Sequence, residues 1–278
     1  MRRLAALLLN LDRRVIFVLV GLAILIPIIR PLNLPGLKVT AAVRGVYDQV
    51  EVLAPRSPLL ISFDFDPASK PELYPMGLAI TRHAFRRDLK VIGTSLWITG
   101  TGLAEEILHT AAREYNRAYG EDYVFLGWQP QPINVIIGLG QDLYKTFPKD
   151  HRGNDTRSLP VLRDVTSLKD IRYMVDLAAG TPGVETWIVY GADKYGFKVG
   201  GGSTAVIEPG LRPFLQTGQL TGLIGAMKGA AEYEALLDQR DKATAGMDAL
   251  SMGHMLVIVL VVFSNVMYWI SRQRSMSQ

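Results

Sequence analysis

The chain has 278 residues, with 30 Lys+Arg, 26 Asp+Glu and no cysteine, and its mean hydropathy is +0.17. Without cysteine there is no disulfide framework, no thiolate metal site and no thiol nucleophile. A content of 20% charged and 49% apolar residues excludes a disordered chain, and the length is sufficient for a sizeable core. The formal charge of +4 implies a polyanion partner only if it lies on the folded domain.

Two uncharged apolar segments lie near the ends of the chain, at residues 15–29 and 250–270. A membrane span needs about 20 apolar residues, so the second segment suffices by itself and the first needs its flanks. We predict transmembrane helices within 1–34 and 249–271. The first segment has two alternatives, a buried core helix and a secretory signal that ends near residues 39–41. Those residues lie far from the apolar run, which favours an uncleaved anchor.

The excess positive charge lies beside these two segments. Residues 31–249 hold 23 Lys+Arg and 25 Asp+Glu, whereas residues 1–30 hold five Arg and one Asp and the tail 272–278 holds two Arg. This distribution is typical of the positive-inside bias of membrane proteins, and it argues against nucleic acid as a partner. It predicts a two-pass protein of a cytoplasmic or inner membrane, with both termini in the cytoplasm and the central domain outside it. Arg30 and Lys38 on the other side of the first segment leave the opposite orientation open.

Between the spans, short β-rich runs alternate with helical patterns. Residues 35–57 form an amphipathic stem or the first core-facing helix. The periodicity then predicts strands at 59–65, 89–96, 123–128, 185–190 and 219–227 and helices at 72–87, 103–119, 167–180 and 230–237. Residues 132–147 are compatible with a strand plus a helix or with one helix. The fold expected for 58–248 is an α/β domain with a doubly wound, mainly parallel sheet.

The first candidate for chemistry is the acidic pair Asp64 and Asp66, where the apolar run 59–65 ends. Ligands of open parallel sheets lie at the carboxyl ends of the strands, and two carboxylates there could hold Mg²⁺ or act as nucleophile and acid. Asp64-Phe65-Asp66 resembles the first motif of the haloacid-dehalogenase-like phosphotransferases. The resemblance implies that Thr94-Ser95 stands for the second motif and Asp193 for the late acidic motif. The alternative is that the aspartates cap a helix or form a turn.

The second candidate is the run Gly200, Gly201, Gly202 and Ser203, which follows Lys198. Consecutive glycines permit a backbone nest that binds an anion. The order of residues differs from a phosphate-binding P-loop, because the lysine precedes the glycines. The alternative, and the one favoured here, is a flexible surface loop.

Two residues of the apolar segments are candidates for contacts between transmembrane helices. Asn265 could donate a hydrogen bond to the first span or to a neighbouring copy, and Gly21 permits close helix approach.

These observations favour a non-enzymatic membrane protein, anchored at both ends, whose α/β domain is a scaffold or assembly subunit of a membrane complex. Its expected partners are membrane lipid and either other copies of itself or other membrane proteins. One alternative is a membrane-tethered phosphohydrolase-like enzyme that uses Asp64 and Asp66, and the other is a small-ligand-binding module. No pair of histidines has metal-ligand spacing, so no metal or cofactor is expected, except Mg²⁺ under the phosphohydrolase alternative.

Overall fold

The computed structural model describes residues 12–34 and 38–275, with side chains up to Trp269. It divides into two compact units: residues 37–243, and the two terminal segments 1–36 and 244–278. Arg2 and Arg3 of the predicted basic segment, residues 35–37 of the predicted stem and the last three residues of the predicted tail lie outside the described residues.

A six-stranded, all-parallel sheet forms the centre of the first unit, with strand order β3-β2-β1-β4-β5-β6. The chain winds outward from β1 to β3, returns to place β4 beside β1, and winds outward again to β6. This is the predicted doubly wound α/β fold, and its topological switch point lies between β1 and β4. The strands are β1 (Pro58–Asp64), β2 (Lys90–Ser95), β3 (Tyr123–Trp128), β4 (Tyr173–Ala178), β5 (Lys198–Ser203) and β6 (Leu220–Gly225).

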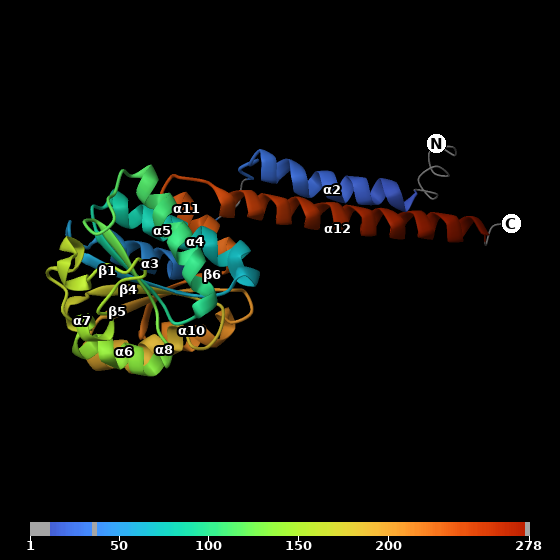
Figure 1. Cartoon of the computed structure of the whole chain (residues 1–278). Coiled ribbons are helices and arrows are strands. Elements are labelled where there is room, and N and C mark those ends of the chain that lie inside the picture. Colours follow the sequence, from blue (N-terminus) through green and yellow to red (C-terminus); the bar gives the residue numbers. More distant parts are fainter. Residues whose placement is uncertain (1–11, 35–37, 276–278) are drawn as a thin grey trace. The chain divides into compact units, whose positions relative to one another are not determined.

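Helices cover both faces of the sheet (Figure 1). One face is covered by α3 (Ala41–Glu51), α4 (Lys70–Arg86), α5 (Thr101–Glu114) and α11 (Ala226–Leu236). The other is covered by α6 (Pro132–Gln141), α8 (Val184–Trp187) and α10 (Glu208–Gln216). Residues 132–147 were predicted to form either a strand plus a helix or one helix. They form two helices, α6 and the short α7 (Leu143–Thr146). A π-helix η6 (Ile188–Ala192) and α9 (Asp193–Tyr195) lead into β5.

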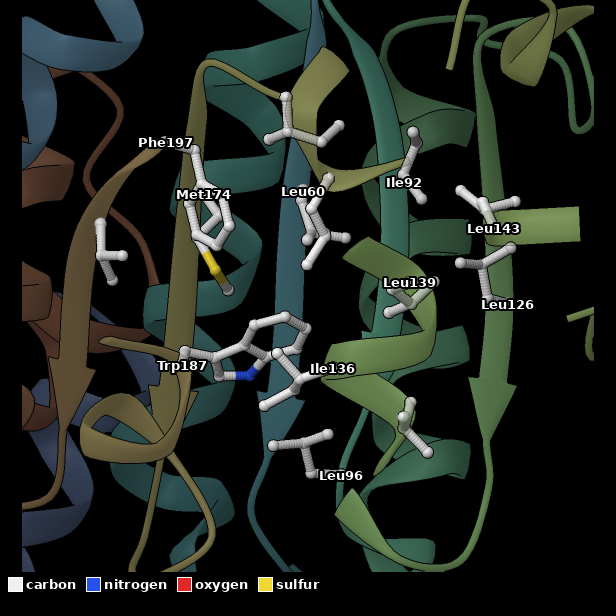
Figure 2. Close-up of a cluster of buried hydrophobic side chains, with 14 of the residues drawn as sticks. Leu60, Ile92, Leu96, Leu126, Ile136, Leu139, Leu143, Met174, Trp187 and Phe197 are labelled. Atoms are coloured by element: carbon white, nitrogen blue, oxygen red, sulfur yellow. The ribbon is translucent and has the colours of Figure 1, made fainter. Parts of the chain in front are cut away.

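The core on the α6 and α8 side is built from aliphatic side chains of strands and helices and from the aromatic side chains of Phe147, Trp187 and Phe197 (Figure 2). Leu60 of β1 and Ile92 of β2 belong to this cluster, and so do Ile136 from α6 and Trp187 from α8. Trp187 is fully buried. Burial of each such side chain contributes roughly 1.5–3 kcal/mol, which holds α6 and α8 on this face of the sheet.

Two predicted elements around β4 are wrong. The helix expected at 167–180 is a single 3-10 turn (Leu168–Asp170), closed by the Ser167 and Asp170 capping box, and is followed by strand β4. All residues of β4 are buried, and a strand covered on both faces is a continuous apolar run that has no alternation to reveal it. The strand expected at 185–190 is α8 and the start of the π-helix.

The glycine-rich run is the interior of strand β5, so the expected surface loop is also wrong. A Cβ atom at Gly200 would overlap the Tyr173 hydroxyl, and one at Gly202 would lie 2.5 Å from the Leu177 side chain. The glycines therefore make room for large side chains of the neighbouring strand β4.

Helix α3 is the first core-facing helix, one of the two alternatives for residues 35–57. Thr40 caps its N-terminus, and Val43, Val46 and Val50 are buried. The backbone of Gly45 lies directly against the carbonyl of Thr221 in β6. Close packing on the edge strand makes this segment part of the α/β domain.

The second unit contains two antiparallel helices, α2 (Arg13–Ile29) and α12 (Lys242–Ser275) (Figure 1). Residues Lys242–Trp269 of α12 are long and apolar enough to cross a membrane. The 17 residues of α2 extend about 25 Å at 1.5 Å per residue, which is shorter than the hydrocarbon core of about 30 Å. The side chains that are partly covered recur every three or four residues on both helices, at positions 16, 20, 23 and 27 and at positions 249, 252, 253, 256, 260, 263 and 267. This spacing is typical of a helix-helix seam.

Candidate functional site

The carboxyl ends of β1 and β4 meet at the topological switch point, where ligands of doubly wound domains bind. Asp64 is the last residue of β1, and Asp176 lies on the neighbouring β4 with Ser62 as its register partner. Residues i and i+2 of a strand lie on one face, so Ser62, Asp64 and Asp176 share the face covered by α8. Both carboxyl groups are completely buried.

Asp64 accepts hydrogen bonds from three surrounding elements. The Leu96 amide donates to Oδ1 over 2.6 Å, the Ser62 hydroxyl lies 2.9 Å from both oxygens, and the Trp187 indole donates to Oδ2 over 3.2 Å. Burial raises the pKa of Asp64 to about 6, although these donors and Asp176 act in the opposite direction.

Asp176 has no such donors. Neither of its carboxyl oxygens accepts a hydrogen bond within the described part of the chain. Burial and the neighbouring Asp64 charge raise the pKa of Asp176 well above its usual value. Sequence reasoning missed this residue because it lies inside the segment 167–180 that was expected to be helical. The available signal was a lone acid within the apolar run of residues 173–178.

Asp66, the second residue of the predicted acidic pair, does not join Asp64. Its Oδ1 accepts from the amide and the hydroxyl of Ser69, both over 3.1 Å, and so caps the short turn before α4. This is the arrangement expected under the capping alternative. Among residues 12–34 and 38–275, no group of three or more His, Asp or Glu side chains is placed to hold a metal ion.

The other residues implied by the phosphotransferase resemblance make structural contacts. The Thr94 hydroxyl donates to the Gly127 carbonyl over 3.2 Å, and the Ser95 hydroxyl donates to the Phe63 carbonyl over 2.7 Å. Asp193 accepts from Gln219 over 3.3 Å in an exposed position. No side-chain hydrogen bond or ion pair in the described part of the chain joins these residues to Asp64 or Asp66.

The lysine and the serine of the predicted anion nest lie at opposite ends of strand β5. Lys198 begins the strand and lies 3.4 Å from the Gln49 amide oxygen, whereas Ser203 ends it. The Ser203 hydroxyl is buried and has no hydrogen-bond partner among the described residues. A cleft of about 60 Å³ lies nearby, lined by the loop after β4 (Gly180, Thr181, Gly183) and by Ile207 and Leu211.

A larger cavity, of about 490 Å³, lies at the carboxyl end of the edge strand β6, between α10 and the first turns of α3 and α11. Its lining combines apolar side chains with two ion pairs. Arg212 lies 2.9 Å from Glu208, and Lys228 lies 3.1 Å from Glu232. Glu232 also accepts from the Thr40 amide over 2.8 Å and from its hydroxyl over 2.7 Å. Sequence patterns do not reveal this cavity, because its lining combines the start of α3 with α10, β6 and α11, which lie far from α3 in the sequence.

In the helical hairpin, neither of the two predicted contact residues makes a described contact between α2 and α12. A Cβ atom at Gly21 would have nothing within 4 Å, whereas one at Gly253 would lie 3.9 Å from Ile24. The Asn265 amide donates to the carbonyl of Val261 on its own helix over 3.0 Å, and its side chain is exposed. The loop after α2 is held to α12 by Asp248, which accepts from the amides of Asn33 over 2.8 Å and Leu34 over 3.1 Å.

Fold and site thus define a doubly wound, all-parallel α/β domain in a chain that also carries an apolar helical hairpin, with a buried carboxyl pair at the switch point of the sheet. Comparison with protein-family models, with curated proteins and with solved structures finds no match for this chain.

Proposed function

We propose that this protein is an assembly subunit of a membrane complex, anchored by α2 and α12, whose α/β domain serves as a scaffold. The observation that carries the proposal is the position of Asn265. Its side chain lies outside the stripe of α12 that faces α2, and its amide oxygen has no hydrogen-bond donor in the described part of the chain.

A polar side chain in the hydrocarbon layer is unfavourable unless another helix or water satisfies it. Ser264, the neighbouring residue, is exposed in the same way, and so are large apolar side chains of both helices, among them Phe17, Ile29, Val262 and Trp269. An amide beside a small hydroxyl on an otherwise apolar face fits contact with a helix of another subunit. The antiparallel hairpin supports a two-pass anchor with both termini on one side of the membrane.

The experiment is the particle mass of the full chain after gentle extraction, compared with the 30.7 kDa of one copy. We expect a larger particle, and we expect Asn265→Leu to weaken it about fivefold, because an interhelical hydrogen bond contributes roughly 1 kcal/mol. Val262→Leu, an apolar change at an exposed site on the same helix, is the matched control. A single-copy particle that contains no other protein would contradict the proposal.

A small-ligand-binding module is the second candidate, favoured by the cavity between α3, α10 and α11. A volume of about 490 Å³ lies within the range of pockets that bind small molecules. Leu215→Trp would fill the cavity from α10. A compound that raises the melting temperature of the native protein and not that of this variant would support the module, and an equal rise in both would count against it.

A further inference from the structure

The hydrogen bonding of the buried carboxyl pair at the switch point is one-sided. Asp64 has three donors, from Ser62, Leu96 and Trp187, while no group of the described residues donates a hydrogen bond to Asp176. Both side chains have 0% exposure. A buried carboxylate without a donor is costly, and two ionised carboxylates side by side repel each other strongly in a site of low dielectric constant.

A single proton removes both penalties. If Asp176 carries it, its O–H group donates to an oxygen of Asp64, and the pair has one negative charge in place of two. Asp64 is the better place for that charge because its donors stabilise the ionised form. We propose that Asp64 and Asp176 form a proton-binding site, in which Asp176 holds one proton at neutral pH and loss of this proton loosens α8 from the sheet.

The groups that face the pair are consistent with this assignment. From β1 comes the Ser62 hydroxyl, from the end of β2 the Leu96 amide, from α8 the Trp187 indole, and from β4 the backbone of Leu177. All are neutral. Burial and Asp64 raise the pKa of Asp176, and the Leu177 amide lowers it although its geometry falls short of a hydrogen bond. No cationic side chain of the described residues acts on Asp176. A proton is therefore the positive charge that the site takes up.

Trp187 connects the pair to α8. Its indole donates to Asp64 over 3.2 Å, and its ring lies in the core beside Leu60 and Ile136 (Figure 2). Helix α8 has only four residues and continues into a π-helix. Gly183, just before α8, lines the cleft of about 60 Å³, and a Cβ atom there would lie 3.5 Å from the Asp176 carboxyl. A second charge on the pair would draw water into this cleft and separate α8 from β4.

The first test is infrared spectroscopy of the full chain in detergent at pH 7. We expect the carbonyl band of a protonated, buried carboxyl group, its loss in Asp176→Asn, and its retention in Asp66→Asn, a matched change in an acid that only caps a turn. If the native protein lacks this band at pH 7, both carboxyl groups are ionised and the proposal is overturned. This outcome needs no comparison with a variant.

The second test is the pH dependence of unfolding. A folded-state pKa above the unfolded value means that the folded protein binds more protons, so stability is greatest at low pH and falls as pH rises through the folded pKa. Above the ordinary pKa of an aspartate, about 4, we expect the unfolding constant of the native protein to rise up to tenfold per pH unit relative to Asp176→Asn until Asp176 loses its proton, and Trp187 fluorescence to change as that proton is lost.

Equal pH slopes for the native protein and Asp176→Asn would overturn the proposal. So would a shift of the infrared band on addition of Mg²⁺, Ca²⁺ or K⁺, because a cation would then take the place of the proton. If Asp176→Asn does not fold, Asp176→Leu, which removes the acid and needs no hydrogen-bond partner, provides the same comparison.

Discussion

At the scale of single residues, His83 is a second buried titratable group, and its pH response has the opposite sign to that of the acid pair. The ring has 0% exposure. Its Nδ1 lies 2.8 Å from the Tyr233 hydroxyl and its Nε2 lies 2.7 Å from a Glu51 oxygen. Burial lowers the pKa of His83 to about 4, although Glu51 acts to raise it. The neutral ring thus donates to Glu51 and accepts from Tyr233, joining α3, α4 and α11.

A group whose folded pKa lies below its unfolded value stabilises the fold above the unfolded pKa, and this stability is lost as pH falls. For His83 the window runs from about pH 6.5 down to about pH 4. We expect the native protein to lose about 3 kcal/mol more than His83→Gln between pH 7.5 and pH 4, at about 1.4 kcal/mol per pH unit. Urea unfolding at each pH measures this. His109→Gln, on the exposed side of α5, serves as control, and a loss of the same size in both variants would contradict the assignment.

At the scale of elements, the strands that sequence patterns predicted correctly are those bounded by clear turn residues. The runs at 59–65, 89–96, 123–128 and 219–227 correspond to β1, β2, β3 and β6. Strand β4 was hidden because the Ser167 capping box suggested a long helix but closes only one turn. Strand β5 was hidden because three glycines have low strand propensity, and their place in the sheet depends on side chains of β4 that fill the space above them.

Only part of the candidate site could be predicted, because the sequence patterns revealed strand β1 and not strand β4. Asp64 was found because it ends a recognisable strand, whereas Asp176 depends on β4 being a strand and on its position beside β1. Trp187 was assigned to a strand and belongs to α8. The contact of these three residues comes from the order of the strands, in which β4 lies beside β1 although more than 100 residues, including β2 and β3, separate the two strands in the sequence. Local periodicity carries no information on such a contact.

At the scale of the whole molecule, residues 37–243 form one compact unit, and we expect residues 38–243 to fold without the terminal helices. Because large apolar side chains of α2 and α12 are exposed, we expect the full chain to need detergent or lipid and the excised domain to be soluble and monomeric. Gel filtration and cooperative unfolding without detergent measure this. An insoluble or unfolded 38–243 would contradict the division into units.

The exact end of the fragment matters, because the residue before α12 and the first residue of α12 complete the packing of α4. Asp241 lies 2.8 Å from the Arg82 guanidinium, whose side chain is only 8% exposed, and the Lys242 ammonium lies 4.5 Å from the centre of the Tyr74 ring. A fragment that ends at residue 237 keeps Glu114 as the partner of Arg82 and loses these two contacts. We expect it to be about 1–3 kcal/mol less stable than 38–243, because a partly buried guanidinium loses one of its two carboxylates. Equal stability of the two fragments would place the boundary of the domain before residue 238.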